Sequence, residues 1–441
     1  MIAFVTLLLG LISGVYPIQV TVGGPVAAVE FTLDGAPAGR IEGPPWVARI
    51  DLGTDLRPRV LTAHALDAEG REIAQVTQWL NLPRPPAEVD IVLENGPDGS
   101  PAAAHLTWQN VSGVPPASIQ LTLDGAPLSA EVKDGMGRAP LPVRDLKALH
   151  ILTAELWFPP GLLARKDVVF GGEYGSEVST ELTVVPVRVR KGTSLPGLDG
   201  LQGWFSAADQ TLTAAAIEDG PGKVVFVQVP AGSAVARELL PGQRRRSIDL
   251  FKNEMRLGKD DRVRFLSLAP SSYRESRIPS QLFDMSTELT PKDGGVFWYL
   301  TKKQTLKKPD IERLRITDAV AVAGLQAAAD NHRRAVVLVV GKETPDASRY
   351  DPATVRRYLE SIRVPLFVWS LDGPDAPAAR AWEQAEDIST MEKLGQAVNR
   401  LRTEMASQKI VWVEGRHLPQ AISLTPAAKG AELAVKAIPQ P

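Results

Sequence analysis

Three short apolar runs in the second half of the chain give its clearest pattern. They lie at residues 223–229, 334–340 and 364–371, and most of their residues are β-branched or aromatic. Such a short, nearly continuous apolar run is typical of a strand that is buried on both faces in a parallel sheet. Helical patterns separate the three runs, so their order predicts a doubly wound α/β domain. Ligands bind at the carboxyl ends of the strands in such sheets. Here the residues at those ends include few side chains suited to catalysis or metal binding.

The other elements of this domain follow from weaker signals. Two more strands are predicted, at residues 261–268 and 410–413, and three helices, at residues 319–331, from residue 352 onwards and at residues 390–405. Thr317 and Asp318 are placed to cap the first of these helices, and Asp351 is placed to cap the second. We therefore predict an α/β domain over residues 222–415 and a C-terminal tail over residues 416–441, frayed after Pro426.

The first half of the chain alternates short β-type runs with turns, which is typical of β-sandwiches. An internal repeat strengthens this prediction, because the sequence of residues 32–37 recurs identically at residues 122–127. We predict one sandwich at residues 15–95 and a second at residues 102–190. A segment rich in glycine and proline separates them, and a linker with a hairpin follows at residues 191–221. Trp108 and Trp157 are predicted to be core residues.

The N-terminal segment bears on localisation. Residues 2–12 are apolar, and Ser13 and Gly14 are small, as in the core and cleavage zone of a secretory signal peptide. Residues 1–14 are therefore predicted to be a signal peptide of an exported protein (periplasmic, cell-surface or secreted), with no integral membrane segment in the mature chain. The alternative is a buried first strand, and the absence of lysine or arginine before the apolar run is a departure from the signal-peptide pattern.

Composition excludes several kinds of chemistry. The chain of 441 residues has a net charge of −2 and no cysteine, so disulfides, thiolate nucleophiles and cysteine-bound zinc are excluded. A neutral chain gives no global field for binding nucleic acid. Its five histidines are widely spaced in the sequence, and none has the spacing of a metal-binding pair. No nucleophile elbow is present. We therefore predict no cofactor and no nucleic-acid partner.

Two family resemblances extend this picture. The order of strands and turns from Val29 to Gly70 resembles a bacterial immunoglobulin-like domain. From about Gly222 to Val413 the chain resembles a von Willebrand factor type A domain, on the basis of the buried strands, Gly232 and Ser233 after the first strand, and Thr317 at a helix start. The combination is similar to exported bacterial proteins with a von Willebrand-related domain, which implies a role in protein interaction.

The second resemblance implies a place for Mg²⁺, which requires several hard oxygen ligands. In that family the first strand ends in Asp-x-Ser-x-Ser, a later loop supplies Thr, and an Asp follows the next buried strand. Here Ser233 and Thr317 match, but the carboxylate positions hold Val229 and either Gly341 or Lys342. Two hydroxyls alone should not hold Mg²⁺, so we predict no metal and expect Ser233 and Thr317 to cap helices. The nearby carboxylates that could form an altered site are Asp318, Glu343 and Asp346.

The sequence therefore favours a non-catalytic, exported interaction protein that binds a protein partner through loops at the strand ends. The residues expected in these loops are Val229, Gly232, Ser233, Thr317, Asp318, Gly341 and Lys342. Two alternatives stay open. One is an enzyme, most plausibly a hydrolase, with an unrecognised site in the α/β domain. The other is a metal-dependent adhesion module with atypical ligands.

Overall fold

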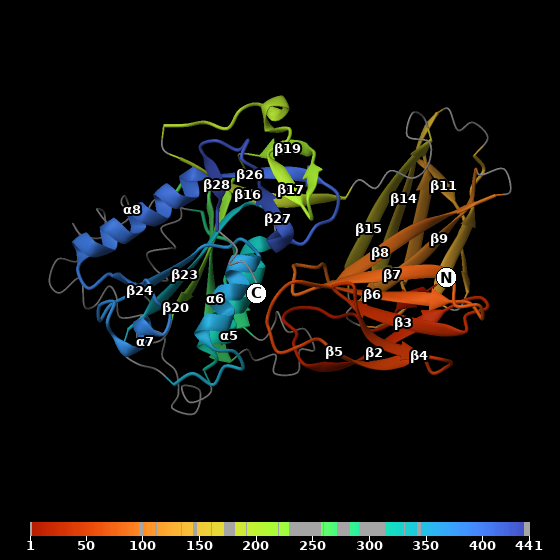
Figure 1. Ribbon diagram of the computed structural model, residues 1–441, viewed down its shortest axis with the longest axis horizontal. Helices are drawn as coiled ribbons and strands as arrows, with labels where there is room; N and C mark the ends of the chain where they lie inside the picture. The colour runs from red at the N-terminus through yellow and green to blue at the C-terminus, as the bar shows by residue number, and fades with distance from the viewer. Residues whose placement is uncertain are drawn as a thin grey trace.

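The computed structural model describes residues 2–96, 100–110, 113–133, 135–143, 148–159, 161–171, 181–190, 192–218, 220–228, 257–258, 260–270, 283–290, 314–329, 331–341 and 345–435. Two β-sandwiches occupy one side of the molecule (Figure 1). The other side holds a parallel sheet with its helices and a separate all-β unit. The chain thus folds into four packed units rather than the three that the sequence predicts.

The first sandwich consists of a three-stranded and a four-stranded sheet. The first sheet has the strand order β1 (Ile2–Phe4), β2 (Val15–Val22), β5 (Val47–Asp51). The second has the order β4 (Ala36–Ile41), β3 (Ala28–Leu33), β6 (Arg59–Leu66), β7 (Glu72–Leu80). Strand β1 pairs with β2, and Ile2, Phe4, Leu8 and Ile12 lie in the core between the sheets. In this structure the apolar N-terminal segment therefore forms the buried first strand that was the alternative to a signal peptide.

The second sandwich has two four-stranded sheets. Their strands are β12 (Glu131–Lys133), β13 (Met136–Pro140), β9 (Pro101–Asn110) and β8 (Ala87–Asn95), and β11 (Ala126–Leu128), β10 (Ser118–Leu123), β14 (Leu149–Phe158) and β15 (Leu162–Gly171). The predicted boundary is misplaced, because β8, which ends at Asn95, pairs with β9 and so belongs to the second sandwich. Trp108 packs against the core, but Trp157 is 43% exposed on the outer face of β14, so its prediction as a core residue is wrong.

The internal repeat has a structural cause. Asp34 and Asp124 both adopt positive φ angles, 53° and 51°, and each is followed by a glycine with φ near 80°. Such Asp-Gly pairs form the tight turns that join antiparallel strands. Each aspartate also accepts a hydrogen bond through Oδ1 from the adjacent strand, at 2.9 Å from Val60 N and 2.8 Å from Ile151 N. The repeated sequence thus builds the same hairpin in both sandwiches.

A third all-β unit is built from segments that precede and follow the parallel sheet in the sequence. One sheet contains β19 (Ala214–Glu218), β26 (Gln408–Glu414), β16 (Leu182–Val189) and β28 (Ala431–Leu433), and the other β18 (Gln210–Leu212), β17 (Phe205–Ala207) and β27 (Ile422–Leu424). Short 3-10 turns lie at Leu198–Leu201 and Pro419–Ala421. This corrects three predictions. Strand β16 is not part of the second sandwich, β26 is not in the parallel sheet, and Ala428, Ala431 and Leu433 of the tail predicted to be frayed pack against a core.

The three apolar runs lie in one mainly parallel sheet, as predicted. Its strand order is β22 (Phe283–Met285), β21 (Arg262–Pro270), β20 (Gly222–Gln228), β23 (Arg333–Val340), β24 (Leu366–Ser370) and β25 (Glu386–Asp387), with only β22 antiparallel. Val224 pairs with Ala335, and Val225 with Val336. The helices α5 (Ile316–Ala328), α6 (Pro352–Ser361) and α7 (Pro377–Arg380) cover one face, and α8 (Met391–Ser407) covers the other.

Close packing explains the small residues of α5. A Cβ atom built on Gly324 would lie 2.0 Å from Leu359 Cδ2 of α6, so only glycine allows the two helices to approach this closely. The core on this face of the sheet also includes Leu56 of the first sandwich. The Tyr358 hydroxyl of α6 donates to the carbonyl of Asn81 at 3.0 Å, and both groups are buried. The parallel sheet and the first sandwich therefore share one apolar interface.

In the part of the chain that the structure describes, no helix has both the length and the apolar character needed to cross a bilayer.

Candidate functional site at the carboxyl ends of the parallel strands

The candidate site lies where β20 and β23 end. Here the strand order reverses, with the first strand in the chain beside the fourth, and this is the position where open α/β sheets bind ligands. Thr317, Asp318 and Gly341 are described by the structure, and all three are buried. The other predicted loop residues, Val229, Gly232, Ser233 and Lys342, lie outside the described residues, as does Glu343.

Asp346 is the central side chain of this site, although it was named only as one candidate for an altered metal site. Its Oδ2 accepts hydrogen bonds from Thr317 N at 3.1 Å and Thr317 Oγ1 at 2.6 Å. Its Oδ1 accepts from Ile316 N at 2.9 Å, and from the amide and hydroxyl of Ser348 at 3.0 and 2.5 Å. A carboxylate has about four lone-pair positions for acceptance, so this carboxylate is fully used within the protein.

The contacts of Asp346 identify it as a helix cap supplied from a distant loop. The first amides of any helix lack partners within the helix, and a carboxylate also interacts favourably with the helix dipole. Asp346 satisfies the first two amides of α5, and Ser348 Oγ accepts from the third, Asp318 N, at 3.0 Å. The prediction that Thr317 caps this helix is therefore wrong, because the helix begins at Ile316 and the Thr317 hydroxyl donates to Asp346.

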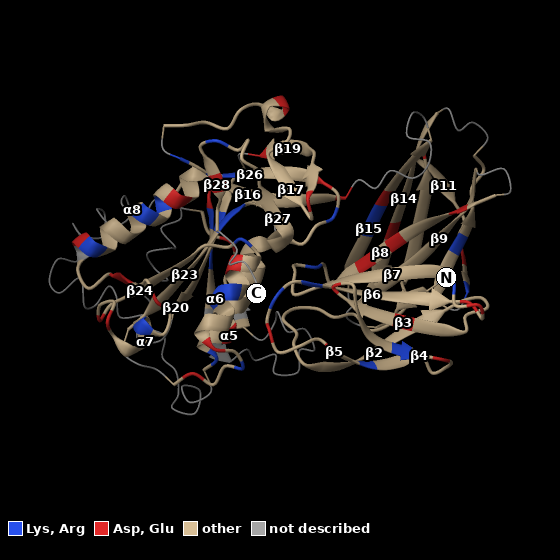
Figure 2. Cartoon of the chain, viewed as in Figure 1, with Lys and Arg blue, Asp and Glu red and all other residues tan. Residues whose placement is uncertain are grey.

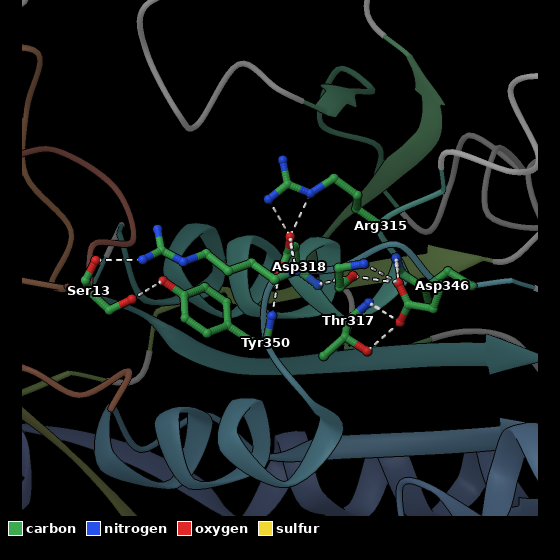
Figure 3. Close-up of polar contacts among 9 residues, drawn as sticks. Ser13, Arg315, Thr317, Asp318, Asp346 and Tyr350 are labelled. Carbon is green, nitrogen blue, oxygen red and sulfur yellow. Dashed lines mark hydrogen bonds and ion pairs between the residues drawn. The ribbon is translucent and has the colours of Figure 1, made fainter. Parts of the chain in front are cut away.

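Asp318 makes the reciprocal contacts from the helix to the loop. Its carboxylate, which is only 4% exposed, accepts from Arg349 N at 3.1 Å and from Tyr350 N at 3.3 Å. Arg315 pairs with the same carboxylate, with Nε at 2.7 Å from Oδ2. A buried carboxylate of this kind requires charge pairing and hydrogen bonds, and Asp318 has both. The start of α5 and residues 346–350 thus hold each other through both backbones (Figure 3).

The same loop reaches the first sandwich. Arg349 Nη2 donates to the carbonyl of Ser13 at 2.6 Å, and the Tyr350 hydroxyl lies 3.0 Å from Ser13 Oγ (Figure 3). Burial raises the pKa of Tyr350 above its usual value. We call the set Ser13, Arg315, Thr317, Asp318, Asp346, Ser348, Arg349 and Tyr350 the latch, because it connects the start of α5 to the first sandwich.

Of the eight latch residues, sequence reasoning named Thr317, Asp318 and Asp346 as candidates for a site. Ser348, Arg349 and Tyr350 carry no recognised family motif. The available signal was Asp346-Ala347-Ser348, an aspartate with a hydroxyl residue two positions later, because such pairs satisfy nearby backbone amides.

The other side chains that could bind a metal or act in catalysis do not form one site among the described residues. Among the described residues, no group of three or more histidine, aspartate or glutamate side chains is arranged to hold a metal ion. His64, His105, His150 and His332 each lie against one carboxylate, of Glu72, Glu94, Asp124 and Glu218 respectively. His417 contacts the backbone carbonyl of Glu414. The histidines thus serve separate local contacts.

Comparison with known proteins gives limited information. No protein-family model matches the chain, and no curated protein matches it. Among solved structures, it is similar to fibronectin(III)-like modules of Clostridium thermocellum CbhA, with 15% identity over 39% of this chain and 94% of that chain and a TM-score of 0.16.

The central fibronectin-III array of RIM-binding protein shows 10% identity, over 46% of this chain and 83% of that chain, with a TM-score of 0.25. A β-glucuronidase from glycoside hydrolase family 2 shows 11% identity, over 49% of this chain and 28% of that chain, with a TM-score of 0.16. These TM-scores are too low to carry an argument about this chain. The chain's own strand pairing establishes two immunoglobulin-like β-sandwich modules.

Proposed function

We propose that this chain is a non-catalytic, exported interaction protein, in which two immunoglobulin-like modules present a von Willebrand type A-like unit to a protein partner. The strand order of the parallel sheet supports the type A-like assignment. Numbered along the chain, its strands lie in the order third, second, first, fourth, fifth, sixth, which is a doubly wound order. The partner binds at the loops where the strands end, since this is where such sheets place their ligands.

The observation that carries this proposal is the latch. Thr317 is the residue that matches the metal-binding threonine of the family, and its hydroxyl donates a hydrogen bond to Asp346. In all, the carboxylate of Asp346 accepts five hydrogen bonds from the chain. A divalent cation at this carboxylate would have to displace hydrogen bonds that hold α5. We therefore propose that recognition here uses the shape and polarity of the loops and does not require a bridging metal.

Site-specific crosslinking tests the position of the partner surface. A photoreactive residue at Pro345 or Asp372 lies at the carboxyl ends of β23 and β24, and both positions are exposed. The control is the same residue at Val132, which is exposed on the second sandwich. We expect one protein to crosslink from the first two positions and not from the third, equally with Mg²⁺ and with a chelator. Equal capture from Val132 would contradict the proposed surface.

Calorimetric titration with Mg²⁺, Mn²⁺ and Ca²⁺ tests the metal-free part of the proposal separately. We expect no heat of binding at millimolar metal. Binding that Thr317→Val abolishes would instead favour a metal-dependent adhesion module with atypical ligands.

A further inference from the structure

A groove at the other end of the parallel sheet has features of a second binding surface. It has a volume of about 1280 Å³ and is lined on one side by residues 188–190 and 192–196, at the end of β16 and after it. On the other side it is lined by residues of α8 between Asn399 and Ser407. In Figure 1 the yellow-green chain that leaves β16 passes above the end of α8. This region, which we call the α8 groove, lies at the amino end of the sheet, because Arg333 at the start of β23 donates to the carbonyl of Met405 in α8.

The rim of the α8 groove carries excess positive charge. Two of its arginines are neutralised, Arg188 by Glu404 and Glu432 and Arg400 by Glu386. Two others are exposed and have no carboxylate partner among the described residues. Arg190 makes no side-chain polar contact there, and Arg402 donates to the neutral side chain of Asn399. Figure 2 shows Lys and Arg on α8 and on the chain near β16.

The floor of the groove is apolar and offers free backbone groups. Val189, Leu195 and Ile217 line it and are only partly covered, and Leu195 and Ile217 continue into the core of the third all-β unit. Within the described part of the chain, the amides of Ser194 and Leu195 donate no hydrogen bond to the protein. An extended peptide uses such features together, because its backbone bonds to free amides and its side chains enter apolar pockets.

We propose that the α8 groove binds an extended acidic segment of a partner protein, with an apolar side chain seated on Leu195 and Ile217 and carboxylates facing Arg190 and Arg402. The volume suits several residues of peptide, since pockets for single small ligands measure about 300–1,000 Å³. The carboxylates of Glu404 and Glu432 in the groove would repel a uniformly anionic polymer. A peptide can place its acidic residues at the rim and away from these carboxylates.

Fluorescence anisotropy with two matched probes tests the proposal on the full-length chain. One probe is a short fluorescein-labelled peptide of glutamate, leucine and glycine, and the other has lysine in place of glutamate. We expect micromolar binding of the acidic probe only, weakened by salt. Arg190→Glu combined with Arg402→Glu should weaken it about tenfold or more, because two rim attractions become repulsions. Leu195→Asp should weaken it as well, through the apolar floor.

The control combines Arg357→Glu with Arg380→Glu, which makes the same charge change on α6 and α7 on the opposite face of the sheet. This control should bind the acidic probe like the unaltered chain, and thermal unfolding should show that all variants fold. Three outcomes would overturn the proposal: no binding of the acidic probe at millimolar protein, equal loss in the control, or tighter binding of a heparin fragment than of the acidic probe. Crosslinking at Pro345 and Asp372 is unaffected by any of them, so the two proposed surfaces are tested separately.

Discussion

Asp346→Ala separates a structural role for the latch from a metal-binding one. The substitution removes the acceptor of the first two amides of α5, at 2.9 and 3.1 Å, and of the Thr317 hydroxyl at 2.6 Å. Loss of a capping side chain costs about 1 kcal/mol, and loss of a carboxylate beside the helix N-terminus costs about 0.3–1 kcal/mol more. Because Ser348 also loses its anchor, we expect a total of about 2 kcal/mol.

Hydrogen exchange followed by mass spectrometry is the suitable assay, because it reports local opening in a protein with several units. An opening free energy lowered by about 2 kcal/mol corresponds to exchange about thirtyfold faster in peptides covering α5. Asp372→Ala is the matched control, since Asp372 is an exposed carboxylate after β24 whose side chain makes no hydrogen bond to the described residues. Both variants are measured in chelator. A ligand carboxylate of an empty metal site would not stabilise the helix, so unchanged exchange in Asp346→Ala would refute the capping role.

Three further predictions concern other contacts. Phe4→Ala should destabilise the full-length chain by about 3–4 kcal/mol in urea unfolding, because Phe4 is 2% exposed in the first sandwich; an unchanged midpoint would show that this segment contributes nothing to the core. Tyr358→Phe should cost about 1–2 kcal/mol, because it leaves the buried carbonyl of Asn81 unpaired, and an intact midpoint would argue against the joint between sandwich and sheet. Hydrogen bonds from Lys393 and Ser389 lower the pKa of Asp387 to about 2, so its stabilisation is present above about pH 4 and lost as the pH falls from there towards 2; the difference in midpoint between Asp387→Asn and the unaltered chain should shrink over the same range.

The sequence predicts the parallel sheet well because its central strands are buried on both faces. Val225, Val336 and Val368 lie in runs whose apolar character does not depend on any distant partner. The third all-β unit could not be predicted in the same way. Strand β16 pairs with β26 over Leu182–Arg188 and Gln408–Glu414, and the entire parallel sheet lies between them in the sequence. Local patterns therefore indicated strands at both places without indicating that they pair with each other.

In the candidate site, too, some residues could be placed from their sequence neighbours and others only from the folded structure. Thr317 and Asp318 adjoin an apolar run, so their position at the start of a helix was predictable from neighbouring residues, although the helix begins at Ile316 and includes both of them. Asp346 lies in a loop after β23, and only the folded backbone brings its carboxylate to Ile316 and Thr317. In the type A resemblance the position of the aspartate falls at Gly341 or Lys342, whereas the carboxylate that reaches Thr317 belongs to Asp346.

The latch also sets a condition on how the strand-end loops can act. Asp346 orders the start of α5, Asp318 orders the backbone of Arg349 and Tyr350, and these two residues contact Ser13. Because residues 346–350 take part in all of these contacts, displacing them would weaken both the helix start and the contact with the first sandwich. Binding with these residues in place avoids that cost, as preorganised surfaces do. For the partner that we propose, the latch therefore favours binding at the strand ends without rearrangement of these residues.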